Sequence, residues 1–257
     1  MTLKLVVDKP KPQKVIYGKD FVNLAGMKMI FCEWGPKSFW MSATPVTRGH
    51  YDGVAGPPRF ADTLKRAVDD EYGMSEAEQA LLPKVSVDRT EAVSFCMQLT
   101  RSAYESAQLP ADHRYKLPTE AQWLHAFYTG SKERPEDLES IAWFGEGERK
   151  LPHLVGQKAP NAWGFHDMLG NVWEWCSGFT KIEEMTPCDE AVYLEKSYAP
   201  DLVVTRGGSW RVAADEMHWN IWRPTPPRLR DIDLGFRVIL CKSRYKPMKI
   251  VAAEMVG

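Results

Sequence analysis

Residues 160–175 read Pro-Asn-Ala-Trp-Gly-Phe-His-Asp-Met-Leu-Gly-Asn-Val-Trp-Glu-Trp, with little of the spacing of either a helix or a strand. The pair Gly170-Asn171 predicts a tight turn, because glycine reaches backbone conformations that other residues avoid. Trp173 and Trp175 are expected in the core, since indole rings bury large areas and need a partner for the N–H group. The stretch therefore predicts a compact domain rich in irregular, hydrogen-bonded loops.

Three shorter motifs surround this stretch. Gly207-Gly208 predicts a strand-end turn, and Trp210 is expected in the core. Arg237 lies in an apolar run, so it should pair with Glu174 or Glu120, because a lone buried charge is costly. The motifs are Leu117-Pro-Thr-Glu-Ala-Gln-Trp123, Arg206-Gly-Gly-Ser-Trp210 and Leu234-Gly-Phe-Arg-Val238.

Apolar spacing and capping residues predict the remaining elements. Strands are expected at Lys14–Tyr17, Met27–Trp34, Phe39–Ala43, Leu202–Thr205 and Phe236–Cys241. Helices are expected near Phe60–Tyr72, after the Ser75 and Glu78 capping box, from Asp88 to about Ala107, and for about ten residues after Thr119.

Composition excludes several classes of protein. The 257 residues are 44% hydrophobic and carry a net charge of -1, which argues against long disorder and against a nucleic-acid partner. No run is long enough to cross a bilayer and residues 1–15 lack a signal-peptide pattern, so we expect cytoplasmic synthesis without membrane insertion. The five cysteines form no close pair and are expected as buried thiols.

Together, these four motifs resemble the formylglycine-generating enzyme, or sulfatase-modifying factor, superfamily. The resemblance implies an α+β, C-type-lectin-like fold with two main helices, short antiparallel strands and little regular secondary structure. It predicts a single domain over residues 1–241, a helical insertion near residues 53–83 and a basic tail at residues 242–257.

The resemblance also directs attention to two kinds of metal chemistry. Enzymes of the family that oxidise a sulfatase cysteine bind copper(I) through two cysteines, and Val212 and Met217 stand at those places. We therefore expect no copper and no formylglycine-generating activity. Iron-dependent sulfoxide synthases of the superfamily need three histidines, and the six histidines here form no close ligand pair.

A calcium site is the other implication of the resemblance. It would use the side chains of Asp167 and Glu174 with the backbone carbonyls of Gly170 and Val172, because calcium prefers hard oxygen ligands. The alternative is that Asp167 and Glu174 cap the loop or pair with an arginine.

The segment from Arg211 to Asp233 is the predicted ligand-binding surface. In variable proteins of diversity-generating retroelements, which resemble this chain, the corresponding part is randomised for ligand binding. Aromatic residues with arginines are typical of interface hot spots. The alternative is that Trp219 and Trp222 pack beneath the loop. The predicted binding residues are Arg211, Glu216, His218, Asn220, Trp222, Arg223, Arg228 and Arg230.

Three functional hypotheses follow. The first is a non-catalytic binding module for a protein or glycan ligand, compatible with a homo-oligomer and with a phage or prophage receptor-binding or virion component, or a retroelement-type variable protein. The alternative is an oxidoreductase-like enzyme or accessory factor of the superfamily, for which Asp215, Glu216 and His218 would be the candidate residues. A third hypothesis is a degenerate regulatory partner of another enzyme.

Overall fold

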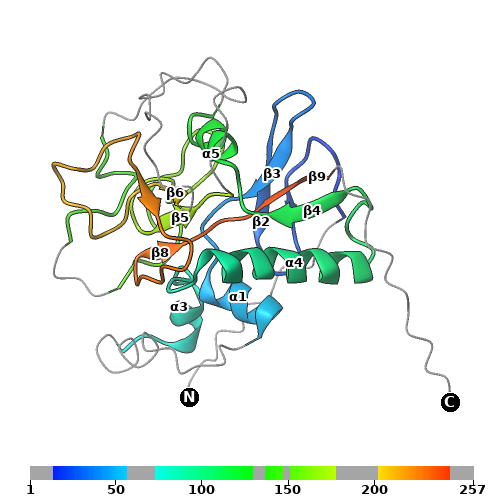
Figure 1. The fold of residues 1–257 in the computed structure, drawn as a ribbon, viewed down its shortest axis with the longest axis horizontal. Coiled ribbons are helices and arrows are strands. Elements are labelled where there is room, and N and C mark those ends of the chain that lie inside the picture. The colour runs from blue at the N-terminus through cyan, green and yellow to red at the C-terminus, as the bar shows by residue number, and fades with distance from the viewer. Residues whose placement is uncertain (1–13, 57–72, 130–136, 147–150, 178–201, 244–257) are drawn as a thin grey trace, which may run out of the picture.

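The computed structural model describes residues 14–56, 73–129, 137–146, 151–177 and 202–243. Two β-sheets lie side by side within these residues, and most of the described helices lie together on one side of them (Figure 1). Mixed helix and curled antiparallel sheet is the C-type-lectin-like architecture that the sequence motifs predict.

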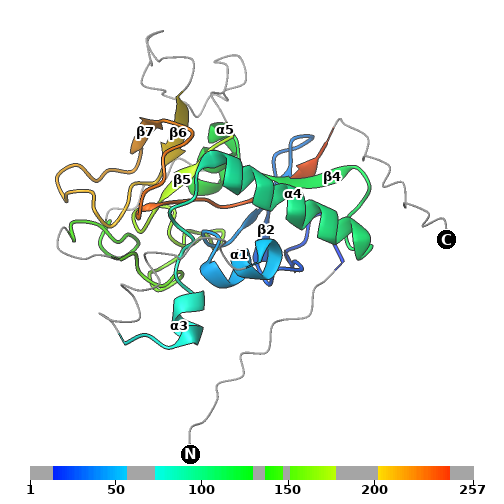
Figure 2. The same cartoon turned by 60° about the horizontal axis from the view of Figure 1, so that its bottom comes forward.

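The larger sheet has five strands in the order β1-β2-β3-β9-β4, and all its pairings are antiparallel. β9, from the last part of the described chain, lies between β3 and β4. Figure 2 shows helix α4 running across one face of this sheet. The strands are β1 (Phe21–Val22), β2 (Lys28–Cys32), β3 (Phe39–Ser42), β4 (His113–Lys116) and β9 (Ile239–Lys242).

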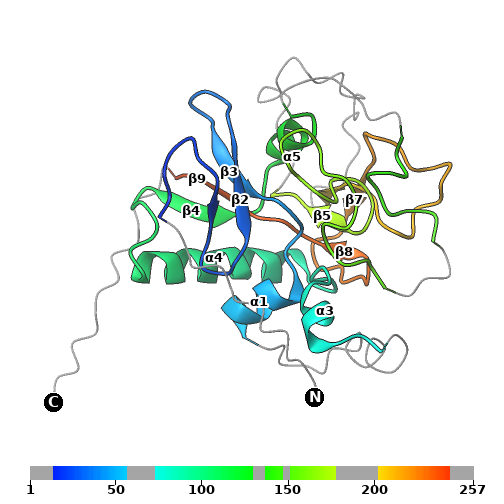
Figure 3. The same cartoon turned by 180° about the vertical axis from the view of Figure 1, so that it is seen from behind.

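The smaller sheet has the order β7-β6-β5-β8, with β5 and β8 parallel. β8 is followed after three residues by β9, so one short stretch belongs to both sheets and ties them together (Figure 3). β7 is an edge strand, which suits Pro224, since proline has no N–H group for a ladder. The strands are β5 (Trp173–Trp175), β6 (Val203–Arg206), β7 (Trp222–Thr225) and β8 (Leu234–Gly235).

Each described helix begins with a capping box, in which two side chains satisfy amides of the first turn. The expected helices after Ser75, Asp88 and Thr119 are confirmed. Helix α1 was not predicted, because its capping partner is a histidine and its sequence contains two glycines. The helices are α1 (Arg48–Ala55), α3 (Glu76–Ala80), α4 (Arg89–Glu105) and α5 (Glu120–Phe127).

Some strand predictions need correction. Lys14–Tyr17 is not a strand; Phe21–Val22 is the first strand of the structure. The run Phe236–Cys241 is not one continuous strand, because β8 ends before it and β9 begins at Ile239. Lys242, predicted to begin the tail, is the last residue of β9. The helix expected near residues 60–72 and the tail beyond Ser243 lie outside the described residues.

The core contains about half of the aromatic side chains that the structure describes. Trp173, Trp175 and Trp210 are buried, as the motifs predict, and so are Trp40 and Trp123. The indole N–H of Trp175 donates to the carbonyl of Val87, which satisfies the polar end of this ring. No helix in the described part of the chain has the length and apolar character needed to span a membrane.

Candidate functional site: the base of the 211–233 segment

The two ends of the 211–233 segment meet at a buried hydrogen bond. The hydroxyl of Ser209 donates to Oδ2 of Asp233 at 2.7 Å, and both side chains are buried. Gly207 and Gly208 lead into the segment with φ of +98° and +75°, which favours glycine at both positions. The segment is therefore fixed at its base by elements of the core.

Arg223 forms an ion pair with the carboxylate of Asp233 but no hydrogen bond. Nη2 of Arg223 lies 3.9 Å from Oδ1 of Asp233, beyond hydrogen-bonding distance, and the guanidinium carbon lies 4.6 Å from the ring centroid of Trp173. Burial raises the pKa of Asp233 and lowers the pKa of Arg223, because both charged groups are partly removed from water.

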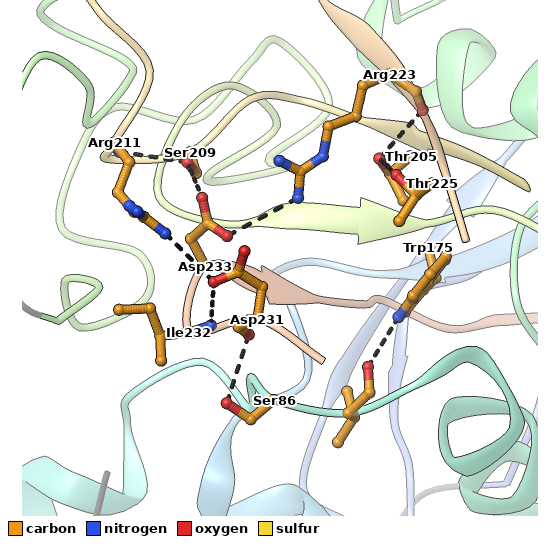
Figure 4. Close-up of polar contacts among 11 residues, drawn as sticks. Ser86, Trp175, Thr205, Ser209, Arg211, Arg223, Thr225, Asp231, Ile232 and Asp233 are labelled. Carbon is orange, nitrogen blue, oxygen red and sulfur yellow. Dashed lines mark hydrogen bonds and ion pairs between the residues drawn. The ribbon is translucent and has the colours of Figure 1, made fainter. Parts of the chain in front are cut away.

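A second arginine lies beside this pair, as Figure 4 shows. Nη1 of Arg211 lies 3.3 Å from Oδ1 of Asp231, and the backbone carbonyl of Asp231 accepts from the amide of Ser86 at 2.9 Å. Two arginines and two aspartates thus alternate over the end of the smaller sheet.

The structure divides the predicted binding residues into two groups. Trp222 and Arg223 are partly buried on β7, which places them at the sheet edge, and Asn220 is partly buried just before this strand. The structure thus brings Arg211 and Arg223 together at the base of the segment, while Glu216 and His218 lie in its outer loop. The exposed residues of the eight are Arg211, Glu216, His218, Arg228 and Arg230.

Asn220 and Arg230 have structural partners. The guanidinium of Arg206 donates to the side chain of Asn220 at 2.8 Å and also pairs with Glu120. Arg230 donates to Asp88 at 2.8 Å and to Glu91 at 2.9 Å, the two residues that cap α4. These contacts anchor the segment to the rest of the fold.

Sequence reasoning missed Ser209, Asp233 and Trp173 as members of this site. Ser209 and Trp173 belong to motifs that were interpreted as structural. Asp233 precedes the Leu-Gly-Phe-Arg motif, and an acidic residue next to an apolar strand is a signal that it needs a buried partner.

The proposed calcium ligands form a different arrangement. Both oxygens of Glu174 accept from the guanidinium of Arg237 at 2.7 Å, and the indole N–H of Trp123 donates to one of them at 2.7 Å. This confirms the predicted partner of Arg237. The carboxylate of Glu174 thus faces a positive charge where calcium would need an open oxygen.

Asp167, another expected calcium ligand, is buried, and its Oδ1 has no hydrogen-bond partner among the described residues. Oδ2 of Asp167 accepts from the amide of Gly156 at 2.7 Å, and burial raises the pKa of this carboxyl. Gly170 has a φ of +68° and packs against the backbone of Trp143. Glu174 thus has the arginine pairing that the sequence left as the alternative, and calcium binding at these four residues stays a prediction.

The positions corresponding to the copper ligands hold Val212 and Met217, and both side chains are buried. A valine has no donor atom, so this pair does not fit copper. Within the described residues, no group of three or more His, Cys, Asp and Glu side chains is placed to hold a metal ion. The described cysteines are buried, as expected, and burial raises their thiol pKa values.

Comparison with known proteins gives sequence relationships as well as structural ones. The chain is 30% identical to hercynine oxygenase of Mycolicibacterium smegmatis over 145 residues, 48% of this chain and 32% of that protein. It thus spans about a third of the length of the curated relatives it matches. Because the match is partial, it does not carry that protein's activity over to this chain.

Two solved structures share the fold at low sequence identity. Treponema denticola variable protein 1 has a TM-score of 0.61 and 20% identity, with 91% of this chain and 100% of that chain covered. CarF has a TM-score of 0.58 and 17% identity, with 84% and 98% covered. The family described as the sulfatase-modifying factor enzyme 1-like domain matches residues 33–242. The chain therefore belongs to the sulfatase-modifying factor enzyme 1-like family.

Proposed function

We propose that this protein is a binding module that contacts a protein or glycan ligand through the 211–233 segment. The observation that carries the proposal is the contrast between the two halves of the segment. Its base is fixed by Ser209 and Asp233, whereas Arg211, Glu216, His218 and Arg228 are exposed. A rigid base with exposed polar side chains favours recognition, because little conformational entropy is lost on binding.

Trp222 supports this proposal from the sheet edge. It is partly buried on β7, next to Arg223, and tryptophan and arginine carry much of the energy of many interfaces. The indole of Trp210 is instead enclosed in the core. Contact residues and fold-supporting residues are thus separable by mutation.

The test compares two sets of substitutions. One variant replaces the four exposed residues Arg211, Glu216, His218 and Arg228 by alanine, and the matched control replaces Met97, Arg101 and Glu105 on the exposed face of α4. Wild type and both variants are applied to a glycan array and to an immobilised-protein array. Loss of a hot-spot contact of about 2 kcal/mol corresponds to roughly thirtyfold in affinity.

We expect the four-residue variant to lose binding to any ligand that wild type retains on the arrays, while the α4 variant keeps it. Both variants should melt as cooperatively as wild type. A ligand that binds the four-residue variant normally, or that is lost only with the α4 variant, would place the contact surface elsewhere.

A second candidate is an enzyme or accessory factor of the superfamily with chemistry of its own. It is favoured by the partial identity to hercynine oxygenase, a protein named for an oxygenase activity. Metal analysis after incubation with iron(II) or copper(I) tests it. Binding of either metal at one ion per chain would favour this candidate over the binding module.

A further inference from the structure

Arg223 is held at the base of the segment by charge and ring contact alone. Within the described part of the chain, its buried Nε and Nη2 atoms have no hydrogen-bond partner. Leaving buried donors unpaired costs free energy, so the guanidinium is poorly satisfied in this position. The side chain is 32% exposed, and turning outward would return both donors to water.

Asp233 is also incompletely satisfied. Its side chain is 4% exposed, Oδ2 accepts from Ser209, and the buried Oδ1 has no hydrogen-bond partner among the described residues. The same guanidinium lies over Trp173, with its carbon 4.6 Å from the ring centroid, and the backbone amide of Trp173 donates to the carbonyl of Asp233 at 2.8 Å. A carboxylate oxygen beside an aromatic face is an arrangement that attracts cations.

We propose that Trp173 and Asp233 form an acceptor site for a guanidinium or alkylammonium group of the ligand, and that Arg223 occupies this site until such a group displaces it. Displacement exchanges one cation on Asp233 for another and returns the donors of Arg223 to solvent. Ser209 holds the carboxylate in place throughout, because its hydrogen bond is to the other oxygen.

The charges around the site favour a cation over an anion. Arg211 is already paired with Asp231, so once Arg223 has turned away the carboxylate of Asp233 has lost its own ion-pair partner. An anion in the same place would lie against this carboxylate and be repelled at short range. The site therefore selects positively charged groups.

This inference rests on the proposed binding function of the segment and names the chemistry of one contact. The cation can come from an arginine or lysine side chain of a partner protein or from a small molecule. Methylguanidinium and an acetylated, amidated Gly-Arg-Gly peptide distinguish these sources, since only the second carries a backbone that has to fit around the site.

The experiment measures binding of both probes by isothermal titration calorimetry to wild type, Arg223→Ala and Arg223→Gln. An intramolecular side chain competes at an effective concentration on the order of millimolar, so its removal should tighten binding by roughly tenfold or more. Arg101→Ala, which removes an exposed arginine of α4 outside the segment, is the matched control and should bind as wild type does.

The double variant Arg223→Ala/Asp233→Asn decides whether Asp233 is the acceptor. Asparagine keeps an oxygen for Ser209 and removes the charge, so methylguanidinium binding should be lost while melting stays cooperative. Equal binding to wild type and Arg223→Ala, or unchanged binding to the double variant, would overturn the proposal. Sulfate that binds wild type and is lost from Arg223→Ala would also overturn it, since Arg223 would then be an anion-binding residue.

The calorimetric experiment and the array experiment can fail separately. Ligands lost from the four-residue variant support the contact surface even if methylguanidinium does not bind. Conversely, a cation site that works in solution remains if the arrays place the contact surface elsewhere. Tight binding of methylguanidinium with no binding of the peptide would assign the site to a small molecule.

Discussion

The carboxylate of Glu174 receives both its guanidinium hydrogen bonds from Arg237, and the two side chains are 1% and 0% exposed. Arg237 also donates to the backbone carbonyls of Ser42, His166 and Asp167. One ion pair therefore connects β5 of the smaller sheet with the end of β3 in the larger sheet and with the loop that precedes β5. Breaking it leaves an uncompensated charge in the core.

Glu174→Gln should destabilise the protein by about 3–5 kcal/mol, because removal of one partner strands the other charge inside the protein. Chemical denaturation followed by tryptophan fluorescence measures this change. Arg101→Ala, which breaks an exposed pair with Glu105, is the control and should change stability by less than about 0.5 kcal/mol. Similar effects of the two substitutions would contradict the role of the buried pair.

Calcium should leave the melting temperature unchanged, because Glu174 already faces Arg237. Thermal unfolding in millimolar calcium and in chelator checks this expectation. An ion that binds only the folded chain would add about 2.7 kcal/mol at a concentration 100 times its Kd. A higher melting temperature in calcium would contradict this expectation. If Asp167→Asn abolished the increase, Asp167 would be a ligand of the ion.

The stability of the protein should depend on the ionisation of Asp167. Burial raises the pKa of this carboxyl in the folded state, so the native chain binds more protons than the unfolded chain between the ordinary and the raised value. Its contribution to stability is therefore present at low pH and is lost as pH rises through the folded-state pKa.

Asp167→Asn should therefore be more stable relative to wild type at neutral pH than at acidic pH. Urea denaturation of both proteins across this range gives the difference directly. A constant difference at every pH would mean that Asp167 titrates alike in the folded and unfolded chains.

Gly170→Ala should cost at least about 2 kcal/mol, since overpacking a tight contact forces the backbone to move. A Cβ at this position would lie 2.6 Å from the backbone nitrogen of Trp143. Gly156→Ala is a matched control: its φ of +75° is similar, but the nearest atom lies at 3.9 Å. Equal losses in the two variants would mean that backbone conformation alone explains the requirement for glycine.

The sequence predicts local structure well where it carries its own chemical signature. Three capping boxes located α3, α4 and α5, and the buried tryptophans followed from their size. The pairing of Arg237 with Glu174 followed from the cost of a buried charge. Short strands were harder: β4 and β7 have four residues each and depend on pairing with distant chain rather than on their own spacing.

The site at the base of the segment depends on contacts over long sequence separations. Asp233 meets Ser209 only because β8 lies parallel to β5, a pairing that no local pattern encodes. For the same reason Arg230, an apparent surface charge in the sequence, meets the caps of α4 some 140 residues earlier. Residue type suggested which side chains could contact a ligand. Only the fold showed which of these side chains already have hydrogen-bond partners within the protein.

The hydrogen bond between Ser209 and Asp233 joins residues that are 24 positions apart. Strands hold both ends of the intervening chain in place, so the ends are already brought together by the fold. Doubling the length of this chain would raise the free energy of closing it by only about 0.6 kcal/mol. The fold can therefore stay the same while the surface of this segment changes. Substitutions and insertions at the exposed positions between the two residues can alter what is recognised, while β7 and the buried Trp210 and Met217 keep the scaffold as it is.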